Sequence, residues 1–266
     1  MRAWGPTDRR SGDTVGGRTL IFCTSYLASA GVWAARYRPW CEHVAGLSIR
    51  REAVFIFDDA SPCLPDAGEA AVHAVLADQA DPGPNFLRFD EHLGRTSPTV
   101  FPGWVRSFLH SVVVARSYGF DKIVHLEADS RILSERMAAH IDALDTGWSA
   151  FWCPAYNIPE TAIQVICADS FGLMEEFARD PVAAQDGQML GMALPFTNID
   201  MSMKGDRYGE VGDLIPPDAD YLCQFEYFKS PIPNASLARK GGDSPPDGKS
   251  DGAPNLWGLL GRLLRR

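Results

Sequence analysis

Glu127 and Asp129 stand one residue apart at the end of an apolar run, in the segment IVHLEADS of residues 123–130. If extended geometry continues past the run, side chains alternate and both carboxylates point to one side. Like charges placed together repel unless a cation lies between them, and carboxylate oxygens suit Mg²⁺ or Mn²⁺. The alternative is a solvated strand end and a turn, in which Asp129 or Ser130 satisfies backbone N–H groups. The sequence leaves both interpretations open.

The elements that would position these carboxylates follow from the apolar pattern. Short apolar runs alternate with helix-length segments, which predicts an α/β fold with a mainly parallel, twisted sheet flanked by helices. The runs predict strands at residues 19–25, 53–57, 85–89, 122–126 and 196–203. Three- and four-residue spacing and composition predict helices at residues 29–45, 68–79 and 104–118.

Polar clusters follow three of the predicted strands. In parallel sheets ligands bind beyond the carboxyl ends of the strands, where the loops converge. The candidate site therefore gathers at one edge of the sheet, and it comprises Thr24, Ser25, Tyr26, Asp58, Asp59, Glu127 and Asp129.

The order of three motifs resembles the GT-A glycosyltransferases, a large group that uses nucleotide-diphosphate sugars. The motifs are TSY (24–26), FIFDDASP (55–62) and HLEADS (125–130), within a resemblance that covers about residues 19–133. The resemblance implies a GT-A-like, Rossmann-like domain in which TSY and the Asp58-Asp59 loop bind the nucleotide. It also implies that Glu127 and Asp129 hold Mn²⁺ or Mg²⁺ and the donor's diphosphate. Glu127 stands where the family's motif commonly begins with Asp, and Leu27 where Asn is common.

The residue types fit a nucleotide ligand. A carboxylate can accept the imide N–H of uracil or a ribose hydroxyl. Because adjacent residues of an extended strand point opposite ways, only one of Asp58 and Asp59 needs to touch the ligand. Tyr26 either packs on the base or belongs to the core, and Arg95 either faces the phosphates or is a surface cation.

The second half of the chain is expected to supply the acceptor side. Asp186 is the candidate catalytic base, because a sugar hydroxyl must lose its proton as it attacks; its alternative is a helix N-cap. Asp206 and Arg207 either line the acceptor site or form an internal ion pair. His125 is expected to be a core residue. The sugar, the acceptor (glycan, lipid or protein) and the choice between inversion and retention stay open.

Two other functions fit the same pattern. A nucleotidyltransferase shares the architecture and the acidic metal site, but the sequence has no Gly-rich, basic loop after the first strand. A non-catalytic binding or scaffold protein on a degenerate transferase fold is the alternative from a different class. A hexosyl- or related sugar transferase is the preferred hypothesis.

Composition limits the partners and the compartment. The net charge of −9 argues against charge-driven nucleic-acid binding. Six scattered cysteines without a C-x-x-C pair predict free thiols in a reducing compartment. Neither a signal peptide nor a membrane span is evident, which predicts a cytoplasmic protein.

The ends of the chain differ from its middle. Residues 1–17 predict a disordered tail, 18–229 the catalytic domain and 230–254, rich in Pro, Gly and Ser, a flexible linker. Residues 255–266, NLWGLLGRLLRR, predict an amphipathic helix. Its leucines and arginines suit an anionic membrane surface or a protein partner, so peripheral attachment at the inner membrane face stays open.

Overall fold

The computed structural model describes residues 17–97, 100–179, 190–211 and 214–224. Within these ranges the main sheet has eight strands, and β10, β11 and β6 form a small second sheet. In spatial order the main sheet consists of β3 (Ala71–His73), β4 (Pro84–Arg88), β2 (Ala53–Asp58), β1 (Thr19–Ser25), β5 (Lys122–Leu126), β8 (Ile158–Cys167), β7 (Trp148–Cys153) and β9 (Asn198–Asp200). The second sheet consists of β10 (Gly205–Asp206), β11 (Tyr221–Leu222) and β6 (Arg131–Ile132).

The strand directions confirm the predicted α/β class. The first five strands in spatial order are parallel to one another. β8 is antiparallel to both of its neighbours, and β9 is parallel to β7. The carboxyl ends of β1, β2 and β5 therefore open at one edge of the sheet, as the sequence predicted.

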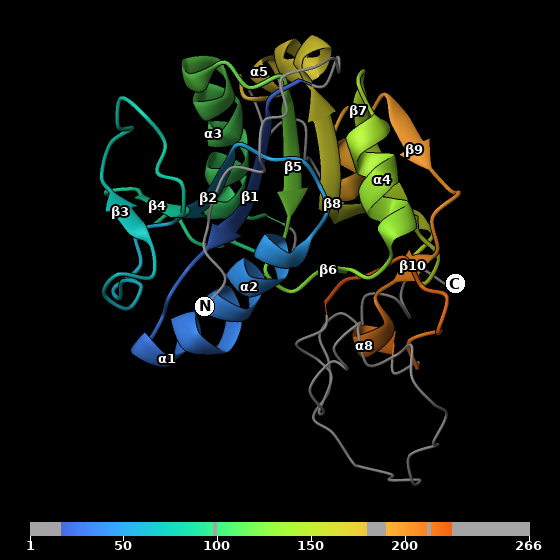
Figure 1. Ribbon diagram of the computed structural model, residues 1–266, viewed down its shortest axis with the longest axis horizontal. Helices are drawn as coiled ribbons and strands as arrows, with labels where there is room; N and C mark the ends of the chain where they lie inside the picture. Colours follow the sequence, from blue (N-terminus) through green and yellow to red (C-terminus); the bar gives the residue numbers. More distant parts are fainter. Residues whose placement is uncertain (1–16, 98–99, 180–189, 212–213, 225–266) are drawn as a thin grey trace, which may run out of the picture.

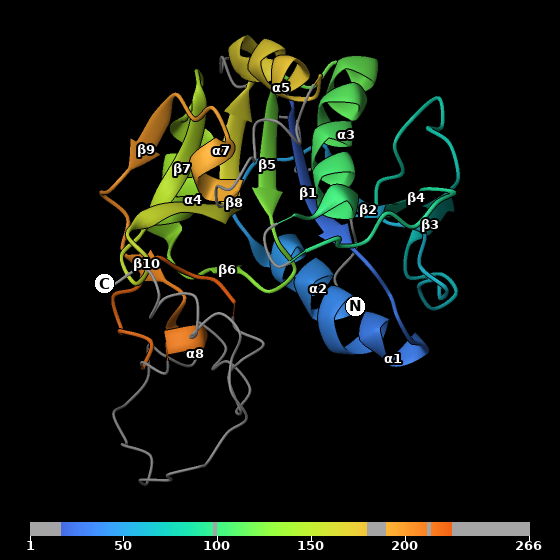
Figure 2. The same cartoon turned by 180° about the vertical axis from the view of Figure 1, so that it is seen from behind.

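Helices cover both faces of the sheet. They are α1 (Ala30–Val32), the π-helical turn η1 (Trp33–Tyr37), α2 (Arg38–Gly46), α3 (Pro102–Tyr118), α4 (Glu135–Ala143), the 3₁₀ turn η2 (Ala168–Ser170), α5 (Phe171–Phe177), α7 (Leu190–Ala193) and α8 (Tyr208–Val211). Figure 1 shows α4 in front of the sheet, and Figure 2 shows α3 in front of its opposite face.

The central strand β1 supplies side chains to two separate cores. Ile21 and Cys23 pack with residues of α2 and α4, whereas Leu20 and Phe22 pack with residues of α3 and α5. This alternation explains why β1 is apolar along most of its length: each face of the strand is buried under helices. The free cysteines are also as predicted, and all six lie in the described ranges, five of them buried.

Two predicted elements are wrong. Residues 68–79 do not form a helix, because β3 within them pairs with the edge of β4 and Gly68 has a left-handed φ of +82°. Tertiary hydrogen bonding thus overrides the helix propensity of an Ala-rich segment. The predicted strand 196–203 is reduced to β9, because Ser202 turns back and donates its backbone N–H and hydroxyl to Asp200.

Candidate functional site

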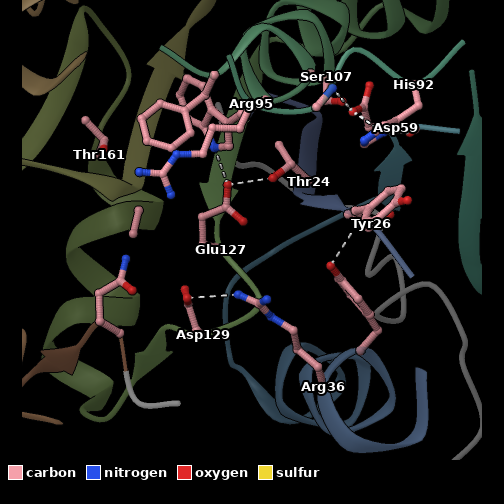
Figure 3. Close-up of a pocket in the computed structure, with 18 of the residues that line it drawn as sticks. Thr24, Tyr26, Arg36, Asp59, His92, Arg95, Ser107, Glu127, Asp129 and Thr161 are labelled. Atoms are coloured by element: carbon pink, nitrogen blue, oxygen red, sulfur yellow. Dashed lines mark hydrogen bonds and ion pairs between the residues drawn. The ribbon is translucent and has the colours of Figure 1, made fainter. Parts of the chain in front are cut away.

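A cleft of about 690 Å³ opens at the carboxyl ends of β1, β2 and β5. Its volume falls within the range that holds small-molecule ligands. Figure 3 shows Tyr26 and His92 at one end, Glu127 and Asp129 in the middle and Thr161 at the other end. The lining residues are Thr24, Ser25, Tyr26, Arg36, Tyr37, Asp59, His92, Gly94, Arg95, Phe101, Gly103, Trp104, Ser107, Glu127, Asp129, Ile158, Thr161, Ala162, Arg207 and Gln224.

Glu127 is held at the end of β5 by donors from three elements. Its Oε1 accepts from Thr24 Oγ1 at 2.8 Å and from Trp104 Nε1 at 2.5 Å, and it lies 2.9 Å from His125 Nε2. Among the described residues all of these contacts fall on Oε1, so Oε2 is the oxygen available to a ligand in the cleft. Burial alone would raise the pKa of Glu127, but the His125, Thr24 and Trp104 contacts hold it below its usual value.

Buried residues behind Glu127 fix the hydrogen-bonding role of His125. Gln164 Oε1 accepts from Trp148 Nε1 at 2.8 Å, so the Gln164 amide nitrogen is the group that faces His125 Nδ1, at 3.4 Å. In a neutral imidazole Nδ1 then accepts and Nε2 carries the proton. His125 Nε2–H therefore donates to Glu127, and the core placement expected for His125 is correct, since the residue is fully buried.

Asp129 reaches the cleft through a turn and not through an extended strand. The backbone N–H of Ser130 donates to the carbonyl of Glu127 at 2.9 Å, so residues 127–130 turn back on themselves. The premise that extended geometry carries both carboxylates to one side is thus wrong, although both line the cleft. Asp129 forms an ion pair with Arg36, with Nη2 2.9 Å from Oδ2.

Asp58 and Asp59 point to opposite sides, as strand alternation predicts. Asp58 is fully buried and accepts from the Ser25 hydroxyl at 2.9 Å and the Ser61 backbone N–H at 2.8 Å. Burial raises the pKa of Asp58, while these hydrogen bonds and nearby Arg88 oppose the rise. Asp58 therefore organises the loop, and only Asp59 lines the cleft.

Asp59 joins three segments at the Tyr26 end of the cleft. Its carboxylate accepts from the Gly94 backbone N–H at 2.7 Å, forms an ion pair with Arg106 and lies 2.9 Å from Nδ1 of His92. An ideal Cβ at Gly103 would overlap the Asp59 carboxylate, so a larger residue at this position of α3 would displace that carboxylate.

Aromatic rings form a platform beside Asp59. The rings of Tyr26 and His92 stack at 4.3 Å between centroids, and Tyr26 is 40% exposed. Tyr26 is thus a partly open ring and not a core residue. Arg95 lines the same cleft, with its guanidinium 4.7 Å from the centre of the Phe101 ring.

Arg207 is paired internally, but not with the partner that the sequence suggested. Its Nε and Nη2 donate to the two carboxylate oxygens of Glu160, at 2.7 and 3.0 Å. Asp206 instead accepts from the backbone N–H groups of Ala155 and Arg207, at 3.0 and 2.8 Å, and it does not line the cleft. The expected Asp206–Arg207 bridge is therefore wrong in its acidic partner. Arg207 still borders the cleft.

Some functional candidates could not be found from the sequence pattern. Trp104, Arg36 and Glu160 are far in sequence from the residues they contact, at positions 127, 129 and 207. The apolar periodicity placed Trp104 only at the start of the predicted helix 104–118. The predicted base Asp186, the linker 230–254 and the segment 255–266 lie outside the described residues.

A metal site in this cleft depends on two carboxylates. In the described ranges there is no cluster of three or more His, Cys, Asp or Glu side chains that could hold a metal ion. Mg²⁺ is nevertheless commonly bound by one or two carboxylates with waters and substrate phosphates. Glu127 fits that chemistry, because it is ionised, oriented through Oε1 and open at Oε2. Asp129 has the same ligand chemistry, but its Oδ2 forms an ion pair with Arg36, which competes with a cation for the carboxylate.

The helices within the described ranges are all too short or too polar to cross a bilayer. No family model matches the chain, and no curated protein matches it.

Solved structures are similar to the chain. One is a glycosyltransferase involved in the glycosylation of the major capsid of PBCV-1, at 9% identity and a TM-score of 0.42 over 78% of this chain and 92% of that chain. Another is the mannosyltransferase PcManGT from Pyrobaculum calidifontis in complex with GDP-Man and Mn²⁺, at 14% identity and a TM-score of 0.41 over 71% of this chain and 56% of that chain. Both of those proteins are glycosyltransferases. Because both TM-scores lie below 0.5, we base the function on the geometry of the cleft.

Proposed function

We propose that the cleft binds a nucleotide-diphosphate sugar and that the protein transfers the sugar to an acceptor hydroxyl. The observation that carries the proposal is the order of groups along one cleft. An aromatic platform formed by Tyr26 and His92 lies at one end, and the charged groups Glu127, Asp129 and Arg36 lie in the middle (Figure 3). The aromatic platform suits the base of a nucleoside, and the charged groups next to it suit the diphosphate that follows the nucleoside.

The nucleoside end offers both stacking and polar contacts. An aromatic ring as exposed as that of Tyr26 can stack on a base whatever its identity. Asp59 holds His92 and the Gly94 loop in place, and its carboxylate borders the position of the ribose. Thr24 and Ser25 border the same end, but their hydroxyls donate to Glu127 and Asp58, so they support the carboxylates.

The diphosphate end must offset the negative charge that grows as the glycosidic bond breaks. Arg95 and Arg36 border this part of the cleft and supply fixed positive charge. Mn²⁺ or Mg²⁺ held by Glu127 and Asp129 would act as a Lewis acid on the leaving diphosphate. Within the chain, Thr24, Trp104 and His125 keep Glu127 ionised and oriented for that role.

The acceptor end is the part of the cleft bordered by Thr161, Ile158 and Arg207. Arg207 is held by Glu160, so it shapes this wall more than it donates to an acceptor. Asp186, which lies outside the described residues, remains the predicted base.

Calorimetry tests the proposal. UDP and GDP, each with and without Mn²⁺, are compared with uridine and guanosine, which lack the phosphates. We expect a diphosphate to bind and the nucleosides to bind at least tenfold more weakly, because charge-assisted contacts contribute about 1.5–3 kcal/mol. Glu127→Gln should weaken the metal-dependent part of binding, while the surface control Glu175→Gln should not. The proposal is contradicted if neither UDP nor GDP binds, or if the nucleosides bind as tightly as the diphosphates.

The C-terminal segment 255–266 stays a separate proposal. Its leucines and arginines suit an anionic membrane surface or a protein partner. Co-sedimentation of the full chain and of a chain ending at residue 254 with anionic vesicles distinguishes the two partners.

A further inference from the structure

The cation that faces Asp129 is already part of the protein. Arg36 Nη2 lies 2.9 Å from Asp129 Oδ2, and the two side chains are 30% and 9% exposed. The better exposed side chain of the pair is thus that of Arg36, which borders the same cleft as Asp129. A divalent ion that bound Asp129 would compete with this arginine for the charge of the carboxylate.

The backbone that carries Arg36 is held in place on both sides. Arg36 belongs to the π-helical turn η1, whose first and last residues, Trp33 and Tyr37, are buried. Trp33 Nε1 donates to Glu69, and the Tyr37 hydroxyl accepts from the backbone N–H of Tyr26 at 3.2 Å. Short π-helical turns are rare and occur frequently at functional sites. The turn therefore presents Arg36 to the cleft from a fixed backbone.

The two carboxylates of the candidate cation site are in different states. Glu127 is oriented by Thr24, Trp104 and His125 on one oxygen and is available on the other. Asp129 is neutralised by Arg36. A divalent ion that binds without a nucleotide thus meets one carboxylate whose charge no arginine offsets, and a second whose charge Arg36 already offsets.

We propose that Arg36 competes with a divalent cation for Asp129 in the empty cleft, and that it turns to the donor's diphosphate when the cation and the nucleotide bind together. This inference rests on the proposed function. A nucleotide diphosphate offers the released guanidinium a new bidentate partner, since arginine matches phosphate oxygens in the same way as carboxylate oxygens. The competition makes the nucleotide and the ion bind cooperatively.

Arg36→Met tests the competition, with Arg38→Met as the matched control. Arg38 starts α2, directly after the same turn, but it pairs with Asp66 and Glu69, which do not line the cleft. Binding of Mn²⁺ alone is measured by electron paramagnetic resonance of the free ion. Binding of UDP and GDP in saturating Mn²⁺ is measured by calorimetry on the same preparations.

The expected signature is a pair of changes with opposite signs. Arg36→Met should bind Mn²⁺ alone about tenfold more tightly than the parent and Arg38→Met, because one competing ion pair is gone. It should bind the nucleotide diphosphate about tenfold more weakly, because one phosphate partner is gone. General loosening of the fold would weaken both.

Other outcomes overturn the inference. It fails if Arg36→Met binds Mn²⁺ no more tightly than the parent, including the case in which neither binds the ion. It also fails if the variant binds nucleotide diphosphate as the parent does. In both cases the proposed function stands as long as the parent binds UDP or GDP. Failure of the parent to bind either nucleotide overturns the proposed function itself.

Discussion

Replacing Arg207 with methionine should cost the protein a large part of its stability. Arg207 and Glu160 form a bidentate ion pair whose side chains are only 8% and 1% exposed. Burial alone would raise the pKa of Glu160, but the charge and hydrogen bonds of Arg207 hold it below its usual value. Arg207→Met would leave Glu160 charged and buried, with backbone N–H groups such as that of Ala162 as its remaining donors.

The magnitude follows from that burial. Removing one partner of a buried ion pair costs about 3–5 kcal/mol. Total stabilities are about 5–15 kcal/mol, and a domain of this size loses about 2–4 °C of melting temperature for each kcal/mol. We therefore expect a fall of about 6–20 °C. Urea unfolding followed by circular dichroism measures the free energy directly.

Two further variants make this prediction specific. Arg116→Met removes an ion pair with Glu175 in which the side chains are 54% and 47% exposed, and it should cost about 0–1 kcal/mol. The double variant Glu160→Met/Arg207→Met should recover part of the loss, because an apolar pair often replaces a buried ion pair without penalty. Recovery is partial because Glu210, 3.6 Å from Arg207, still loses its cation. The reasoning is refuted if the free energy of unfolding of Arg207→Met lies within about 1 kcal/mol of that of the parent. In that case the fold would not depend on the ion pair, and Arg207 would be available to an acceptor.

Two other predictions test the electrostatics and the close approach of helix α3. Because the folded-state pKa of Glu160 is depressed, its stabilisation is complete above the unfolded value of about 4.3 and is lost as the pH falls through the folded value. The urea concentration at half-unfolding should thus fall once the pH is lowered below about 4.3. It should fall less steeply with pH for Glu160→Met/Arg207→Met, and equal slopes for the parent and this variant would contradict the prediction. Gly103→Ala should lower the melting temperature and weaken UDP or GDP binding, because the new Cβ would meet Asp59 Oδ2 at 2.2 Å, whereas Gly31→Ala adds a Cβ with nothing within 4 Å. Equal effects of the two alanines would show that Asp59 tolerates the approach.

The sheet was predictable because its strands are buried on both faces. Strands such as β1 and β2 are mostly apolar in sequence, and polar residues that line the cleft lie at or directly after their carboxyl ends. The edge of the sheet was less predictable. β3 has side chains that are only partly buried, so its pattern carried no strand signal, and its pairing with β4 decides its conformation.

The candidate site was predictable in position but not in detail. Thr24, Asp59 and Glu127 line one cleft, as their places after successive strands indicated. Their partners could not be predicted, because Trp104 reaches Glu127, and Gln164 reaches the neighbouring His125, only in the folded chain. The sequence offered Arg207 either the acceptor site or an ion pair with its neighbour Asp206, whereas the fold brings Glu160 from β8 to it.

Pairing decides which charges of this cleft a ligand can use. Arg207 is committed to Glu160, and Asp59 is committed to Arg106 and His92. Arg36 and Asp129 are committed to each other, but their ion pair borders the cleft and can be exchanged for a phosphate and a cation. Glu127 keeps one oxygen without a protein donor among the described residues. The sequence does not distinguish these charged residues from one another. Their burial and their ion pairs in the folded chain distinguish those that stabilise the fold from those that can bind a diphosphate.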